Sequence, residues 1–169
     1  NGGNPEDSTG MIAKALERKD DLRIKIDGKA YSTGAYFLLY VDPKNIEATN
    51  ISKGLFHRAA YPSWVENNKE IMTQDRWDYL DKTNADLRSA LEARVSEEDF
   101  KRVTKVSYDE LFSNESRVDV FLTASEMKDL GLIGKINTVT PEREKEISAA
   151  YSDIAAMYQG VKVSDNHFD

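Results

Sequence analysis

Three residues of this chain carry the functional groups of a serine hydrolase. Ser32, His57 and Asp119 supply a hydroxyl, an imidazole and a carboxylate. A serine hydroxyl is a weak nucleophile until a base takes its proton, and histidine is the usual base near neutral pH. A carboxylate can hold the imidazole in the productive orientation and stabilise its charged form. If these groups converge in space, the sequence predicts a serine hydrolase, and a peptidase in particular.

The segment around Ser32 suits a nucleophile. It reads Gly-Lys-Ala-Tyr-Ser-Thr-Gly-Ala over residues 28–35, and it follows a run over 22–26 in which apolar and charged residues alternate as in a strand. We therefore predict that Ser32 lies where a strand turns into a helix. Small neighbours allow a sharp turn and close approach of a substrate carbonyl, and a helix N-terminus favours a developing oxyanion. Such a site favours acyl transfer.

The chain has two histidines, and His57 is the better candidate for the base. It ends the apolar stretch 54–57, which can hold an imidazole at the end of a strand, whereas His167 lies in a polar C-terminal tail. A lone histidine beside an apolar stretch is more often a core residue than a catalytic one. Its association with the Ser32 segment favours the catalytic interpretation.

The segment around Asp119 completes the set. Asp119 lies between two valines, just ahead of a helix start at which Thr123 and Glu126 form a capping-box pattern. Gly131 is the expected C-cap of that helix. A carboxylate between two valines is expected to be withdrawn from solvent and to need a partner, and an imidazole N–H would serve.

Together these segments resemble the ClpP family, the proteolytic subunits of the Clp proteases. The resemblance rests on Gly28-x-Ala30-x-Ser32-x-Gly34-Ala35, on Phe56-His57, and on Asp119-x-Phe121-Leu122-Thr123-Ala124-x-Glu126 followed by Leu130-Gly131-Leu132-Ile133. In addition, Asn1-Gly2-Gly3-Asn4 resembles the end of the family's Ser-Pro-Gly-Gly motif. The chain order Ser, His, Asp fits poorly with chymotrypsin, subtilisin and the α/β-hydrolases.

The resemblance covers residues 1–137 and implies both a fold and an activity. The implied fold is α/β, a ClpP/crotonase-like spiral of β-β-α units with a helical handle and with the family's N-terminal part missing. The implied activity is that of an ATP-dependent Clp-type serine endopeptidase acting on peptides or unfolded proteins. By this resemblance the backbone amides of Gly3 and Thr33 form the oxyanion hole, the subunits assemble into heptameric rings, and an AAA+ unfoldase or a phage capsid protein is the partner.

Composition sets limits on other functions. The chain has 169 residues, 40% of them hydrophobic, which is enough for one compact domain with a core. Its net charge of −7 argues against nonspecific binding to nucleic acid or to an anionic membrane. It has no cysteine and two histidines far apart in sequence, so we expect a mechanism without metal or other cofactors. The expected location is the cytoplasm, or the host cytoplasm for a phage-encoded protein.

Periodicity predicts the elements that position these residues. A helix is expected over 7–18 and strands over 46–49 and 54–57, a β-α-β-α-β order typical of an α/β fold. The clearest helix spans 74–93, with apolar residues at helical spacing and Asn84 as the polar exception, which could specify register between helices. Further helical pieces are expected over 96–103 and 107–112.

Two regions depart from the family pattern. In the handle, residues 58–113, His57 is followed by Arg58-Ala59-Ala60-Tyr61-Pro62 in place of the family's Gln-Pro and glycine-rich strand. The second departure is an extension over 138–169, in which Thr140-Pro141 begins a helix with an apolar stripe formed by Ile147, Tyr151, Ile154 and Tyr158 and followed by Gly160. That helix could cover its own subunit, a neighbouring subunit or a partner.

Three alternative functions remain open. The unusual handle and the extra helix are compatible with a non-catalytic Clp-like scaffold or modulator subunit, and the extension with a phage head-maturation protease. A crotonase-type acyl-CoA enzyme would share the general fold and the use of backbone amides as an oxyanion hole. Binding of coenzyme A would identify the last of these.

Overall fold

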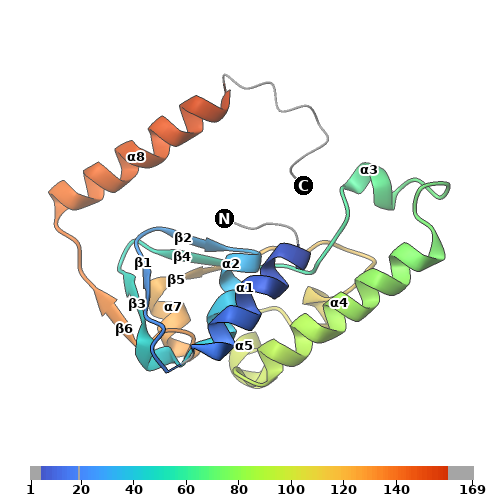
Figure 1. The fold of residues 1–169 in the computed structure, drawn as a ribbon, viewed down its shortest axis with the longest axis horizontal. Helices are drawn as coiled ribbons and strands as arrows, with labels where there is room; N and C mark the ends of the chain where they lie inside the picture. The colour runs from blue at the N-terminus through green and yellow to red at the C-terminus, as the bar shows by residue number, and fades with distance from the viewer. Residues whose placement is uncertain (1–4, 19, 160–169) are drawn as a thin grey trace.

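The computed structural model describes residues 5–18 and 20–159, and within them the side chains of 10–18 and 20–150. The fold is mixed α/β (Figure 1). The strands are β1 (Ile24–Ile26), β2 (Lys29–Tyr31), β3 (Ile46–Thr49), β4 (Lys53–Phe56), β5 (Val120–Thr123) and β6 (Lys135–Asn137). The helices are α1 (Pro5–Glu17), α2 (Thr33–Phe37), α3 (Ser63–Glu66), α4 (Gln74–Glu92), α5 (Glu97–Thr104), α6 (Tyr108–Leu111), α7 (Ala124–Asp129) and α8 (Pro141–Gln159), with 3-10 turns η1 (Leu38–Tyr40) and η2 (Pro43–Asn45).

The strands form two three-stranded sheets. One has the order β1-β3-β6 with parallel pairing throughout; the other has the order β2-β4-β5, with β2 parallel and β5 antiparallel to β4. The first four strands alternate between the two sheets: β1 and β2 precede α2, and β3 and β4 precede α3 and α4. The chain thus uses the order β-β-α twice. The predicted α/β class is confirmed.

A buried serine fixes the corner where β3 passes into β4. The Ser52 hydroxyl donates to the Ile26 carbonyl at 2.7 Å, accepts from the Thr49 amide at 3.2 Å and lies 2.8 Å from the Thr49 hydroxyl. Both ends of the corner are therefore bound to the end of β1. Because Ser52 is 1% exposed, these polar groups could not form hydrogen bonds with solvent water instead.

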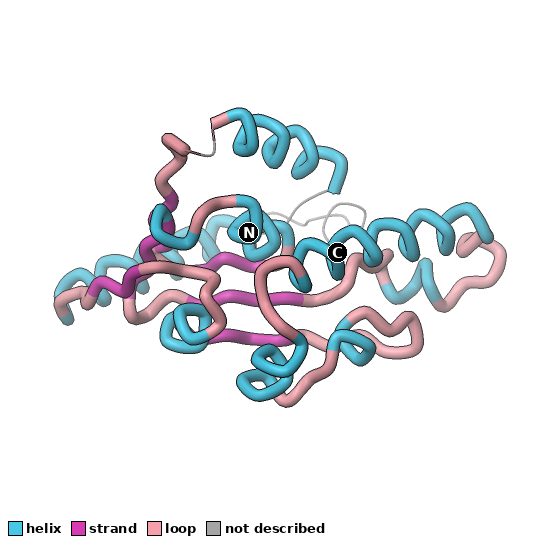
Figure 2. The backbone as a smooth tube through the Cα atoms, turned by 90° about the horizontal axis from the view of Figure 1, so that it is seen from below, coloured by secondary structure: helices cyan, strands magenta, loops and turns pink. Residues whose placement is uncertain are grey.

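The main core contains buried residues of both sheets and of the helices around them. Figure 2 shows strands side by side in the middle of the molecule with helices on either side. The largest fully buried side chains include Phe56, Leu91, Phe100, Tyr108, Leu122 and Met127. A Cβ on Gly54 would lie 2.9 Å from the Met127 sulfur, so α7 packs closely on β4 and a side chain at position 54 would require Met127 to shift. A smaller apolar cluster of Val65, Met72 and Leu80 joins α3 to the outer half of α4.

Locally determined features agree with the sequence predictions. The Thr123–Glu126 capping box is present, with the Thr123 hydroxyl accepting from the Glu126 amide at 3.2 Å. Gly131 follows α7 with a φ of 70°, as a glycine C-cap requires. The helix predicted over 74–93 is α4, and the Thr140 hydroxyl caps the start of α8 by accepting from the Arg143 amide.

Two expectations about local structure need correction. The strand that leads directly into Ser32 is β2, whereas the run over 22–26 supplies β1 of the other sheet. Two short strands replace the single expected one because the chain turns at Asp27 and Gly28 between them. Asn84 is buried, but its amide binds the backbone of Ala59 and does not set a helix register.

The C-terminal helix α8 follows β6 and runs beyond the sheets (Figure 1). Ile147, the first member of the predicted apolar stripe, is buried. The side chains of the other three members, and Gly160, lie outside the described part of the chain. Among the described helices, none combines the length and apolar character that a membrane span needs.

Candidate active site

Ser32 occupies the junction between β2 and α2, as the sequence predicted, and its backbone has an unusual conformation. Its φ is 55° and its ψ is −122°. Among the described residues Lys105 is the other non-glycine with positive φ, but its ψ of 14° places it in the ordinary left-handed region at the end of α5. A residue with a Cβ in the conformation of Ser32 stores about 1–3 kcal/mol of strain, and such strain clusters at functional sites.

Hydrogen bonds hold Ser32 in this conformation. Its amide donates to the Leu55 carbonyl of β4 at 2.9 Å, continuing the β2–β4 ladder, and its carbonyl accepts from the amides of Ala35 and Tyr36 in the first turn of α2. The strand and the helix are therefore both anchored at the residue between them. A serine on a strained strand-to-helix turn is the geometry of a nucleophile elbow.

His57 follows directly after β4, which pairs with β2, the strand that leads into Ser32. The Tyr36 hydroxyl, on the helix that begins after Ser32, donates to the His57 carbonyl at 3.0 Å, and the Tyr36 ring packs edge-on against Phe56. Burial, with a smaller effect of Tyr108, raises the pKa of Tyr36 far above its usual value, so its hydroxyl stays a neutral donor. The nucleophile helix and the strand of the candidate base are thus directly linked.

The imidazole of His57 has a defined partner. Its Nδ1 lies 2.6 Å from the backbone carbonyl of Arg58. Because a carbonyl oxygen can only accept, Nδ1 must carry the proton in this contact, which leaves the Nε2 lone pair as the basic site of the neutral ring. This is the tautomer that a general base for a serine hydroxyl requires.

Asp119 is brought close to His57 by strand register but lies at the surface. Phe56 pairs with Val120 as the last pair of the antiparallel β4–β5 ladder, so His57 and Asp119 are the residues directly beyond this end of the ladder. The Asp119 side chain is 47% exposed and forms an ion pair with Arg117 at 3.9 Å. The prediction that Asp119 is withdrawn from solvent is therefore wrong, because β5 begins only at Val120 and Asp119 lies at the open end of the sheet.

The three candidate residues thus lie next to the same end of the β2-β4-β5 sheet. Within the described part of the chain, their side chains are not hydrogen-bonded to one another. The structure places Thr33, a predicted oxyanion donor, at the first position of α2. The other predicted donor, Gly3, lies outside the described residues. No group of three metal-ligating side chains occurs among the residues that the structure describes.

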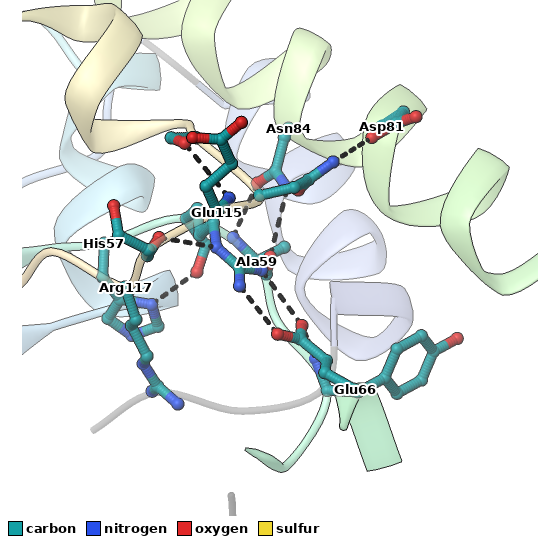
Figure 3. A network of polar contacts seen from close by, with 12 residues as sticks. His57, Ala59, Glu66, Asp81, Asn84, Glu115 and Arg117 are labelled. Atoms are coloured by element: carbon teal, nitrogen blue, oxygen red, sulfur yellow. Dashed lines mark hydrogen bonds and ion pairs between the residues drawn. The ribbon is translucent and has the colours of Figure 1, made fainter. Parts of the chain in front are cut away.

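Sequence reasoning missed a buried ion pair beside His57 (Figure 3). Arg58 is 2% exposed and binds both carboxylate oxygens of Glu66, at 3.0 and 2.7 Å. Its Nε also donates to the Ser116 carbonyl at 3.3 Å, in the loop that leads to Asp119. Glu66 in turn accepts from the Tyr61 amide. The sequence does show a charged residue, Arg58, directly after the predicted base. It does not show that Glu66, eight positions later, is the partner of Arg58.

Asn84 is a second element that holds the same segment. Its Oδ1 accepts from the Ala59 amide at 2.7 Å, and its Nδ2 donates to the Ala59 carbonyl at 3.1 Å. The chain after His57 is thereby bound to α4 by both backbone groups of one residue (Figure 3).

Comparison with known proteins adds no assignment to this geometry. No protein-family model matches the chain, and no curated protein matches it in sequence. The interpretation of the site therefore depends on the arrangement of its residues.

Proposed function

We propose that this protein is a serine peptidase in which Ser32 is the nucleophile, His57 the general base and Asp119 the third member of the triad. The single observation that carries the proposal is the strained backbone of Ser32 at a strand-to-helix junction beside the strand that ends at His57. Strain of this size is concentrated at functional sites, and presenting a nucleophilic hydroxyl at the end of a sheet would explain it.

In the proposed mechanism, His57 Nε2 accepts the Ser32 proton as the hydroxyl oxygen attacks a peptide carbonyl. The amides of Thr33 and Gly3 stabilise the tetrahedral oxyanion, and Asp119 stabilises the imidazolium. His57 then gives its proton to the leaving amine. Water, activated by the same imidazole, hydrolyses the acyl-enzyme and restores Ser32.

The surface next to the site supports a peptide substrate. Tyr31, Leu55 and Phe121 are register partners across the three strands, and Phe121 is 59% exposed. The rings of Tyr31 and Phe121 meet edge-on with centroids 6.0 Å apart. Leu55 lies two residues before His57 and Phe121 two residues after Asp119, so this row is close to both candidate residues along the chain. An apolar side chain of a bound peptide would pack on this row.

The chain uses the order β-β-α twice and has a helical handle over 58–113. Both features support the more specific proposal that the protein is a ClpP-like subunit. By resemblance to that family, the protein would assemble into rings in the cytoplasm and receive unfolded polypeptides from an AAA+ unfoldase.

A fluorophosphonate probe tests the nucleophile. We expect a single adduct by intact mass on the complete protein, absent in Ser32→Ala and retained in the control Ser89→Ala, which changes an exposed serine of α4. His57→Ala should slow labelling by at least ~10³-fold if the two residues act as a unit. Absence of an adduct on the folded, assembled protein would refute the proposal.

A non-catalytic Clp-like scaffold is the second candidate. It is favoured by the ion pair of Asp119 with Arg117 and by the lack of hydrogen bonds among the three candidate side chains in the described chain. Failure of the labelling experiment, together with an intact oligomer, would support this function.

A further inference from the structure

The backbone directly after His57, at Arg58 and Ala59, is held by more hydrogen bonds than a surface loop needs. The Arg58 carbonyl and the Ala59 amide belong to one peptide group, and both of its polar atoms are bound. The carbonyl accepts from His57 Nδ1 at 2.6 Å, and the amide donates to Asn84 Oδ1 at 2.7 Å. This peptide group is therefore held between the candidate base and helix α4.

The side chain of Arg58 holds the adjoining peptide group, between Ala59 and Ala60. Its guanidinium donates to the Ala59 carbonyl at 3.1 Å and to the Glu66 carboxylate, and its Nε donates to the Ser116 carbonyl. Burial of the Glu66 carboxylate raises its pKa, but the hydrogen bonds and charge of Arg58, with the Tyr61 amide, outweigh burial, so the pKa lies below its usual value. Glu66 is thus the charged partner that a buried guanidinium needs.

A buried ion pair of this kind contributes little net stability by itself. Taking both charges out of water costs several kcal/mol per ion, and well-packed apolar residues often stabilise as much or more. What the pair provides is geometry, because the planar guanidinium binds a carboxylate through two hydrogen bonds in a fixed orientation.

We propose that Arg58 and Asn84 are positioning residues that set the tautomer of His57, by holding the Arg58–Ala59 peptide group where its carbonyl accepts a hydrogen bond from Nδ1–H. The proposal rests on the proposed function of His57 as a general base. It assigns the orienting contact of the resting imidazole to a backbone carbonyl, and leaves to Asp119 the stabilisation of the charged ring during the reaction.

Nitrogen-15 NMR of the histidine ring measures the tautomer directly. The sequence has two histidines, so His167→Gln leaves His57 as the single signal. At a pH where the ring is neutral, we expect the shift pattern of the Nδ1–H tautomer. In Arg58→Met and Asn84→Leu the pattern should move toward the Nε2–H tautomer, whereas Asp119→Asn should leave it unchanged.

Fluorophosphonate labelling of the complete chain gives the functional readout. Arg58→Met and Asn84→Leu should label about 10–100-fold more slowly, the loss typical of a small misplacement of a catalytic group. Arg88→Met is the matched control, since Arg88 also binds two carboxylate oxygens, one of Glu92 and one of Asp109, but makes no contact with Arg58 or Ala59 backbone groups. It should change neither the tautomer nor the labelling rate. Urea unfolding verifies that each variant is folded.

Three outcomes would overturn this inference: an Nε2–H tautomer in the unchanged chain, folded Arg58 and Asn84 variants with unchanged spectra and labelling, or loss of the Nδ1–H tautomer in Asp119→Asn. If the Arg58 or the Asn84 variant fails to fold, the tautomer measured in the unchanged chain and in Asp119→Asn still tests the proposal. A chain that has the Nδ1–H tautomer but takes no probe would refute the peptidase proposal and leave the positioning of His57 intact.

Discussion

The strain at Ser32 can be measured by comparing two substitutions at that position. Ser32→Ala keeps the Cβ and therefore the strain of φ 55° and ψ −122°, whereas Ser32→Gly removes it. Release of strain is worth about 1–3 kcal/mol, and the extra freedom of glycine in the unfolded chain costs roughly 0.4–1 kcal/mol. We expect Ser32→Gly to be more stable than Ser32→Ala by about 1 kcal/mol, which corresponds to roughly 2–4 °C in Tm for a chain of this size.

A second serine provides the control of opposite sign. Ser89 is exposed within α4, where glycine should be less stable than alanine by about 1 kcal/mol. Urea unfolding followed by circular dichroism, with all four variants at the same pH and salt, gives the two differences. The reasoning would be refuted if alanine at position 32 were as stable as glycine, because Ser32 would then carry no strain for function to explain.

Two further predictions concern buried polar groups. Ser52→Ala should lower the free energy of unfolding by about 1–3 kcal/mol, because the Ile26 carbonyl loses its donor in the interior. As a control, Ser125→Ala, at an exposed serine, should change the free energy of unfolding by no more than ~0.5 kcal/mol. Equal effects of the two substitutions would contradict the prediction. Glu66 has a pKa lowered in the folded state, so its stabilising effect is present above its usual pKa of 4.5 and is lost as the pH falls through the folded value. The stability difference between the unchanged chain and Glu66→Gln, from urea titrations at pH 7 to 3, should therefore shrink in acid; a constant difference would show that Arg58 does not depend on the Glu66 charge.

Features determined by neighbours in sequence could be predicted. The capping box of Thr123 and Glu126 and the glycine C-cap at Gly131 depend on hydrogen bonds and dihedral angles within a few residues. The periodic helix α4 and the position of Ser32 between a strand and a helix follow from local patterns of the same range. The short strand that precedes Ser32 was misplaced because a three-residue strand has little periodicity to detect.

Features that depend on strand register could not be predicted. That His57 and Asp119 lie directly beyond the last residue pair of one ladder follows from the pairing of β4 with β5, whose residues lie far away in the sequence. The exposure of Asp119 is decided by where β5 begins, and not by the valines that flank it.

The sequence by itself determined which side chains could do chemistry and which local element carries each of them. Only the tertiary structure decided how they are held: the strained φ of Ser32, the Arg58 carbonyl on His57 Nδ1, and the partners Glu66 and Asn84 that fix that carbonyl. The reason is that caps and turns are closed by bonds between near neighbours alone, whereas Ser32 and the Arg58–Ala59 peptide group are held by partners on other elements, Leu55 of β4 and Asn84 of α4.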